Sequence, residues 1–181
     1  MDYKSLISEK LKGNSDIYLV GVFNDKKLSH LNKSISNATL KLAEKCFDNN
    51  NFTGDIGDNR TFDDIENKFQ IIFFGLGAKD KYGPINLNRS INLIINKIKK
   101  TNTKSISLNI DNIISKKLAI SLEHIVSSIE NGLYKYSYKN EKVAVKIKKC
   151  SFVSKNFIPS KIFNSLTLTG KAISNGIKLA K

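Results

Sequence analysis

The stretch KFQIIFFGLG, residues 68–77, is a mainly apolar run that ends in Gly75-Leu76-Gly77. Short apolar runs bounded by turn residues are typical of strands that are buried on both faces of a sheet. DIYLVGVF, residues 16–23, has the same character and is rich in β-favouring side chains. We therefore expect two strongly buried strands, and these two stretches decide the fold class.

The segments after these two strands have helical periodicity. After the first strand, apolar residues recur at helical spacing, with Ser29 available as the N-cap. The expected face of this helix comprises Leu28, Leu31, Ile35, Ala38, Leu42, Cys46 and Phe47. After the second strand, Pro84 marks the expected helix start, and positive charge at Lys99 and Lys100 suits its end. The stripe of this second helix comprises Leu87, Ile91, Ile94, Ile95 and Ile98.

The alternation continues to the end of the chain. SISLNID (105–111) and KVAVKIKKCSFV (142–153) alternate as strands do, and a helix is expected between them from near Ser115. A turn-rich loop at 48–59 leads into a short extended piece. The last helix carries an apolar stripe of Ile162, Phe163, Leu166, Thr169, Ala172, Ile173, Gly176, Ile177 and Ala180. Strands separated by helices predict an α/β fold with a mostly parallel mixed sheet flanked by helices.

Charge is distributed unevenly along the 181 residues. The chain has 30 Lys and Arg against 16 Asp and Glu, and residues 97–181 hold 17 of the basic but only 4 of the acidic groups. A basic half can bind a polyanion such as nucleic acid, but the abundance of Asn, Ile and Lys is also expected from an AT-rich genome. The candidate nucleic-acid contacts are Lys135, Tyr136, Lys139, Lys142, Lys146 and Lys148. Lysine and aromatic side chains suit electrostatic contact and base stacking, whereas base-specific reading usually needs arginine.

Catalytic and metal-binding motifs fail when their spacing is tested. GLGAKD, residues 75–80, has Asp80 where a dinucleotide loop needs glycine, and the loop at 48–59 departs from the calcium-binding pattern. His30 and His124 are expected on the surface, and the acidic residues Asp63, Asp64 and Glu66 in an exposed turn. Cys46 and Cys150 indicate neither a disulfide framework nor a zinc site. We expect no catalytic and no metal-ligating residue in this chain.

Several stretches in the same order carry a family resemblance. They are LVGVF (19–23), IIFFGLG followed by AKD (71–80), GLYKYSYK (132–139) and GIKLAK (176–181). Together they resemble the N-terminal domain of the cytosol (leucyl) aminopeptidase family over about residues 16–181. In that family a Gly-x-x-x-Ala-Arg/Lys segment runs directly into the catalytic domain, and Gly176, Ala180 and Lys181 match its start.

The resemblance implies a macro-domain-like α/β domain at residues 1–158 and a long connecting helix at residues 159–181 that leads to an absent catalytic domain. In the family that second domain holds two divalent metals, usually zinc, manganese or magnesium. The resemblance further implies a homohexamer that releases N-terminal amino acids from peptides. Because no apolar run reaches the roughly 20 residues needed to cross a bilayer and the N-terminus lacks the features of a signal peptide, we expect a cytoplasmic protein without a membrane segment. The parent protein is then an enzyme whose catalytic residues lie outside these 181 residues.

Two other functions stay open beside this accessory domain of a metalloaminopeptidase. One is an electrostatic module that binds nucleic acid, including DNA, through the lysines of the basic half. The other is a macro-type binder of a nucleotide or ADP-ribose, which rests on fold analogy alone.

Overall fold

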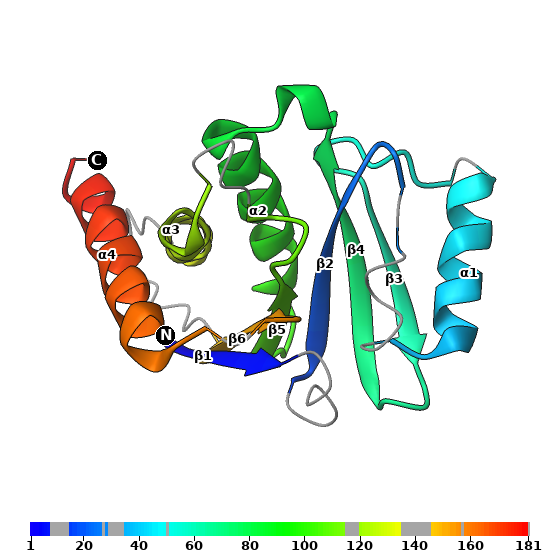
Figure 1. Cartoon of the computed structure of the whole chain (residues 1–181), viewed down its shortest axis with the longest axis horizontal. Helices are drawn as coiled ribbons and strands as arrows, with labels where there is room; N and C mark the ends of the chain where they lie inside the picture. Colours follow the sequence, from blue (N-terminus) through cyan, green and yellow to red (C-terminus); the bar gives the residue numbers. More distant parts are fainter. Residues whose placement is uncertain are drawn as a thin grey trace.

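The computed structural model describes residues 1–7, 15–26, 28, 35–49, 51–114, 120–134, 146–156 and 158–180. In this part of the chain, helices cover both faces of a single sheet (Figure 1). The strands are β1 (Asp2–Ile7), β2 (Ile17–Phe23), β3 (Asn59–Asp64), β4 (Phe69–Gly77), β5 (Ser105–Asn109) and β6 (Lys149–Ser154). The helices are α1 (Asn37–Asp48), α2 (Pro84–Ile98), α3 (Leu122–Leu133) and α4 (Ser160–Leu179), with a short 3₁₀ turn at Lys79–Lys81.

The sheet has the strand order β1-β6-β5-β2-β4-β3. Neighbouring strands run parallel throughout, except that β3 is antiparallel to β4. In β2, Ile17 lies opposite Gln70 of β4 on one side and Ile106 of β5 on the other. This arrangement confirms the predicted α/β fold with a mostly parallel mixed sheet.

The two faces of the sheet carry separate apolar cores. Along β2, Leu19 packs with residues of α2 and α3, whereas Val20 packs with residues of α1 on the opposite face (Figure 1). Every residue of β2 is buried, and β4 is buried except at Gln70, which is half-buried. A strand covered on both faces needs apolar side chains at consecutive positions, because alternate residues enter opposite cores. Both decisive stretches are therefore confirmed as buried strands.

Helix α2 matches its prediction closely. Pro84 is its first residue, and the end follows at Ile98, next to Lys99. Proline is well suited to this position because the first N–H groups of a helix have no partner inside the helix. The predicted stripe of Leu87, Ile91, Ile94, Ile95 and Ile98 is entirely buried.

Helix α1 begins later than predicted and turns another face to the sheet. Its N-cap is Ser36, whose hydroxyl accepts the N–H of Thr39, and Ser29 and Leu31 lie outside the described residues. Leu42 is 59% exposed, so the expected face was wrong there. Leu40, Ala43 and Phe47 of α1 are buried in the core, and Cys46 of the predicted face packs against it while half-buried.

A buried carboxylate explains where α1 starts. Asp64 is only 1% exposed, which contradicts the expectation of an exposed acidic turn, and it accepts the Ser36 N–H at 2.9 Å. The backbone and side-chain N–H groups of Asn67 also donate to Asp64. Burial raises the pKa of Asp64, but these hydrogen bonds outweigh burial and hold its pKa below the ordinary value. Asp64 thus ties the β3–β4 turn to the first turn of α1.

Other boundaries also differ from the predictions. Helix α3 starts after Ser121, not near Ser115, and residues 115–119 lie outside the described part. The connection before α3 is held by the Tyr82 hydroxyl, which donates to the Ile113 carbonyl at 3.0 Å. Strand β6 starts only at Lys149, and β1 was not predicted because its half-exposed residues form no apolar run. Partial exposure is usual for a strand at the edge of a sheet.

The glycines of GLGAKD serve loop packing. The N–H of Gly75 donates to the Asp58 carbonyl, and the N–H of Gly77 donates to the Gly54 carbonyl. A Cβ atom at Gly75 would lie 1.8 Å from the carbonyl oxygen of Asp55, so only glycine permits this approach. The loop between α1 and β3 therefore lies directly on the end of β4.

The role of Asp64 leads to a prediction about stability and pH. Asp64→Asn replaces an acceptor of three N–H groups, and we expect the free energy of unfolding at pH 7 to fall by about 2 kcal/mol. The lowered pKa stabilises the folded state above the ordinary pKa of Asp, and this stabilisation is lost as the pH falls through the folded-state pKa. The difference from the wild type should therefore shrink between about pH 5 and pH 2 in urea unfolding.

Asp63→Asn is the matched control for this experiment. Asp63 is the exposed neighbour of Asp64, and we expect its substitution to change the free energy of unfolding by less than about 0.5 kcal/mol. Equal effects of the two substitutions at pH 7 would contradict the structural role of Asp64.

Candidate functional site

The predicted nucleic-acid contacts are only partly covered by the structure. Lys135, Tyr136, Lys139 and Lys142 lie outside the described residues. Lys146 and Lys148 are exposed on either side of the buried Ile147, directly before β6. This agrees with the expected alternation of lysine and apolar side chains at 146–148. Binding of nucleic acid by this surface stays a prediction.

Lys146 and Lys148 lie at the end of the sheet at which the parallel strands begin, which we call the sheet edge. The Lys148 N–H donates to the Lys104 carbonyl at 2.8 Å, and the Lys146 ammonium donates to the Asn102 side chain. A hollow of about 460 Å³ at this edge is lined by residues that include Asp16 and Lys104. Of these lysines, Lys104 lines the hollow together with Asp16, whereas Lys146 and Lys148 contact its neighbours Asn102 and Lys104.

Asp16 is already engaged in holding this edge together. Its carboxylate accepts the backbone N–H groups of Lys104 at 2.8 Å and Ser105 at 2.9 Å. Burial acts to raise the pKa of Asp16, but these hydrogen bonds and the nearby Lys104 charge lower it by more. The pKa of Asp16 therefore lies below its ordinary value. Through these two bonds Asp16 joins the start of β2 to the start of β5.

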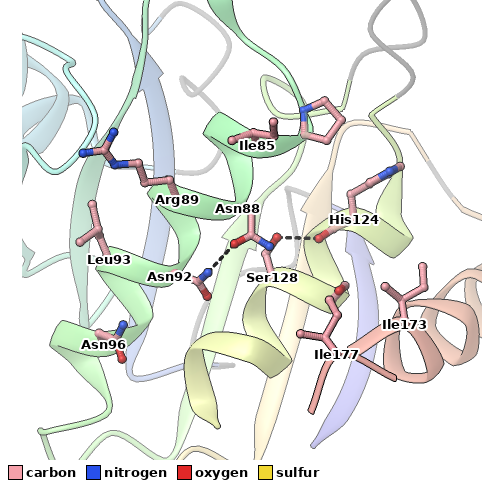
Figure 2. A pocket seen from close by; sticks show the side chains of 12 residues that line it. Ile85, Asn88, Arg89, Asn92, Leu93, Asn96, His124, Ser128, Ile173 and Ile177 are labelled. Carbon is pink, nitrogen blue, oxygen red and sulfur yellow. Dashed lines mark hydrogen bonds between the residues drawn. The ribbon is translucent and has the colours of Figure 1, made fainter. Parts of the chain in front are cut away.

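A larger hollow lies among the helices on the other side of the molecule from α1. Helices α2 and α4 form its walls, and α3 forms its floor (Figure 2). We call this hollow, of about 610 Å³, the helical groove. Ile85 and Leu93 of α2 and Ile173 and Ile177 of α4 contribute apolar side chains to the walls. All four are exposed, which leaves an apolar surface in contact with solvent.

The floor and one wall of the helical groove carry polar side chains. Asn88, Asn92 and Asn96 follow each other at four-residue spacing on α2, and the Asn92 amide donates to the Asn88 side chain. The Ser128 hydroxyl donates to the main-chain carbonyl of His124 at 2.8 Å, as Figure 2 shows. Because this bond does not reach the imidazole ring, Ser128 and His124 do not form a nucleophile and base pair.

His124 has a structural role that the sequence analysis did not predict. The expectation was a surface histidine, whereas the side chain is half-buried at the start of α3 and lines the groove. Its Nδ1 atom lies 3.1 Å from the Ser121 hydroxyl and accepts the Ser121 N–H at 3.4 Å. This reciprocal arrangement caps the first turn of α3.

The stripe predicted for the last helix is not the face that α4 buries. Its buried residues are Phe163, Thr167, Gly170 and Ser174. Of the predicted stripe only Phe163 is fully buried, whereas Ile162, Ile173 and Ile177 are exposed. Small side chains let α4 lie close to α3, and the Ser174 hydroxyl donates to the Asn131 side chain at 2.8 Å. The isoleucines are consequently rotated away from the core, and Ile173 and Ile177 face the groove.

Two glycines set the spacing of the three helices. A Cβ atom at Gly170 of α4 would lie 2.7 Å from both the Glu123 carbonyl oxygen and the Val126 Cβ of α3. A Cβ atom at Gly132 of α3 would lie 2.9 Å from Ile95 of α2. Both distances are below ordinary contact, so the helices pack with glycine between them. The width of the groove follows from these two contacts.

Among the described residues, no group of three or more His, Cys, Asp or Glu side chains is placed to hold a metal ion. No helix in the described ranges is both long and apolar enough to cross a membrane.

Over the described residues the chain forms a three-layer α/β domain, with α1 on one face of the sheet and α2, α3 and α4 on the other. A family model described as the N-terminal domain of the cytosol aminopeptidase family matches residues 19–142, which is more than half of the chain. The chain therefore belongs to the cytosol aminopeptidase family and corresponds to its N-terminal domain.

Curated relatives agree with this assignment. A probable cytosol aminopeptidase of Buchnera aphidicola subsp. Baizongia pistaciae is 26% identical over 180 residues, covering 94% of this chain and 36% of the relative. The corresponding protein of Buchnera aphidicola subsp. Schizaphis graminum is 27% identical over 191 residues, covering 98% of this chain and 36% of the relative. The chain thus spans just over a third of the length of these relatives.

Solved structures share the fold. A mutant of tomato leucine aminopeptidase superposes with a TM-score of 0.76 at 12% identity, covering 99% of this chain and 37% of that one. The bottromycin maturation enzyme BotP superposes with a TM-score of 0.59 at 10% identity, covering 89% of this chain and 30% of that one. At these identities the likeness shows the fold alone.

The contrast between two glycines of α4 provides a test of the helix packing. Gly170→Ala places a Cβ against the backbone of α3, and we expect it to lower the free energy of unfolding by about 1–3 kcal/mol. Gly176→Ala meets no atom within 4 Å, and we expect a gain of up to about 1 kcal/mol from helix propensity. Thermal unfolding of both variants should therefore shift in opposite directions. Shifts of equal sign and size would contradict the close approach at Gly170.

Proposed function

We propose that this chain is the non-catalytic N-terminal domain of a leucyl aminopeptidase that uses two metal ions to release N-terminal amino acids from peptides. The observation that carries the proposal is the match of residues 19–142 to the N-terminal domain of the family. The chain spans 36% of each curated relative, which leaves room in a full-length protein for a second domain. In this proposal the catalytic residues belong to that second domain.

The two divalent metals, zinc, manganese or magnesium, are assigned to the second domain as well. The described residues of this chain do not fit such a centre, because they bring no three metal-binding side chains together. Carboxylates that are well placed in the fold have structural partners, as Asp16 and Asp64 show. No step of peptide hydrolysis is therefore assigned to a residue of this chain.

The remaining parts of the proposal concern assembly and location. The full-length protein is proposed to be a homohexamer in the cytoplasm, with peptides as substrates. The name "cytosol aminopeptidase" of the family model and of the relatives supports the location. The oligomeric state follows from the family resemblance, and light scattering of the full-length protein measures it.

A comparison of two polypeptides tests the proposal. One is the 181-residue chain, and the other is the chain extended along its natural reading frame. We expect the extended polypeptide to hydrolyse leucine p-nitroanilide in the presence of Mn²⁺, Zn²⁺ or Mg²⁺ and to lose this activity with a chelator, because bound metal activates the attacking water. The 181-residue chain should show no turnover under the same conditions.

The controls separate a failed proposal from a failed preparation. Circular dichroism establishes that both polypeptides are folded, and metal added back after chelation should restore the activity of the extended form. Metal-dependent turnover by the 181-residue chain would overturn the non-catalytic role. A folded extended polypeptide that stays inactive with all three metals would overturn the assignment to an aminopeptidase.

A further inference from the structure

The helical groove is poor in charged residues compared with the rest of the chain. Of the twelve residues that line it in the described structure, Arg89 is the only one with a formal charge at pH 7 when histidine is neutral. Charged residues make up 25% of the sequence, so a surface of this size would hold about three on average. The central parts of protein–protein interfaces are depleted of charge in the same way.

The apolar side chains that line the groove come from both α2 and α4. Ile85 is 83% exposed and Leu93 45% on α2, while Ile173 is 43% and Ile177 37% exposed on α4. Figure 2 shows the two isoleucines of α4 across the groove from the asparagines of α2. An apolar surface concentrated in one concave region, not scattered singly, indicates a binding site for another apolar surface.

The polar groups of the groove are enclosed or paired within the domain. The Asn92 amide donates to Asn88, and the Asn92 Oδ1 atom is buried against α3, where a Cβ atom at Gly132 would lie 3.1 Å from it. The Ser128 hydroxyl donates to the His124 carbonyl. The groove therefore offers an occupant mainly the apolar side chains of its walls.

Nucleic acid does not fit this description. Phosphate groups are bound mainly by lysine and arginine, and the groove offers Arg89 alone among its described lining residues. Lys104, Lys146 and Lys148, at the start of the parallel strands, are not among the residues that line the groove. The chemistry of the groove favours a protein surface over a polyanion.

The position of α4 indicates which protein surface occupies the groove. Ile173 and Ile177 of the groove wall stand in the last two turns of α4, which ends at Leu179. This end of the helix is held in place, because Ser174 donates to Asn131 and the Lys178 ammonium lies 3.8 Å from the Glu130 carboxylate. Whatever follows residue 181 in a longer protein begins within a few residues of the groove.

We infer that the helical groove is the docking surface for the domain that follows residue 181 in the full-length protein, which places apolar side chains between α2 and α4. This inference rests on the proposed function, in which the relatives' additional length is a catalytic domain. A short tether gives the docking domain an effective concentration of about millimolar, so a contact of modest area is sufficient. Docking would fix the orientation of the catalytic domain relative to this one.

Cysteine labelling tests the docking directly. Ile177→Cys and Leu93→Cys place one thiol on each wall of the groove, and Leu168→Cys is the matched control on α4, where Leu168 is 67% exposed and does not line the groove. All variants carry Cys46→Ser, because Cys46 is half-buried, whereas Cys150 is buried and stays in place. Each variant is made in the 181-residue chain and in the extended polypeptide, and the rate of maleimide labelling is followed by mass spectrometry.

We expect both groove thiols to react at least tenfold more slowly in the extended polypeptide than in the 181-residue chain. Leu168→Cys should react at the same rate in both. Equal rates for the groove thiols in the two polypeptides would overturn the inference. Protection in the 181-residue chain that rises with protein concentration would also overturn it, because a second copy of this chain would then be the occupant.

Activity measurements on the same samples keep this inference separate from the proposed function. Metal-dependent aminopeptidase activity without protection of the groove would refute the docking and leave the proposed function standing. Protection of the groove in an extended polypeptide that is folded but inactive with every metal would support docking and refute the aminopeptidase assignment.

Discussion

The structure depends on the close contact between the backbone of α3 and its two neighbouring helices. Gly132 brings α3 against Ile95 of α2, and Gly170 brings α4 against the Glu123 carbonyl of α3. Helices that pack this closely must present small residues along the contact, which is why α4 buries Thr167 and Ser174 in place of its isoleucines. The exposed apolar surface of α4 is a geometric consequence of this requirement.

The same contact connects the fold with the proposed function. The floor of the helical groove is α3, and its walls stand at the distance that the two glycines allow. A helix that buries small residues on one side and exposes isoleucines on the other can serve two interfaces at once. One interface completes this domain, and the other is available to a neighbouring domain in the same protein.

The sequence predicted the elements whose side chains are buried on more than one side or carry a clear helical stripe. The predictions of strands β2 and β4 and of helix α2 were confirmed. Consecutive apolar residues in the two strands, and periodic ones in the helix, must be buried in the core, and only these elements bury them all. The face of α4 was wrong because Thr167, Gly170 and Ser174 are buried through close backbone contact, which hydrophobicity does not reveal. Asp64 and His124 were both predicted on the surface, which was wrong for a related reason. Each side chain accepts a backbone N–H, that of Ser36 for Asp64 and that of Ser121 for His124, and such bonds allow a polar side chain to be buried wholly or in part. The groove was not predicted, although the asparagines at 88, 92 and 96 were a visible repeat on one helix face.

The pairing of β1 with β6 has a consequence for the order in which the chain can fold. Asp2 lies opposite Lys149, so the strand that leaves the ribosome first has its partner only after residues 149–154 have been made. Strands β2 and β4, with α2, can assemble while synthesis continues, because their contacts are nearer in sequence. The N-terminal segment therefore remains without its native partner until residues 149–154 have been made, and the pairing of β1 with β6 forms after the other strands of the sheet are available. Such a late, long-range pairing slows folding and leaves a strand edge exposed to other chains until it forms.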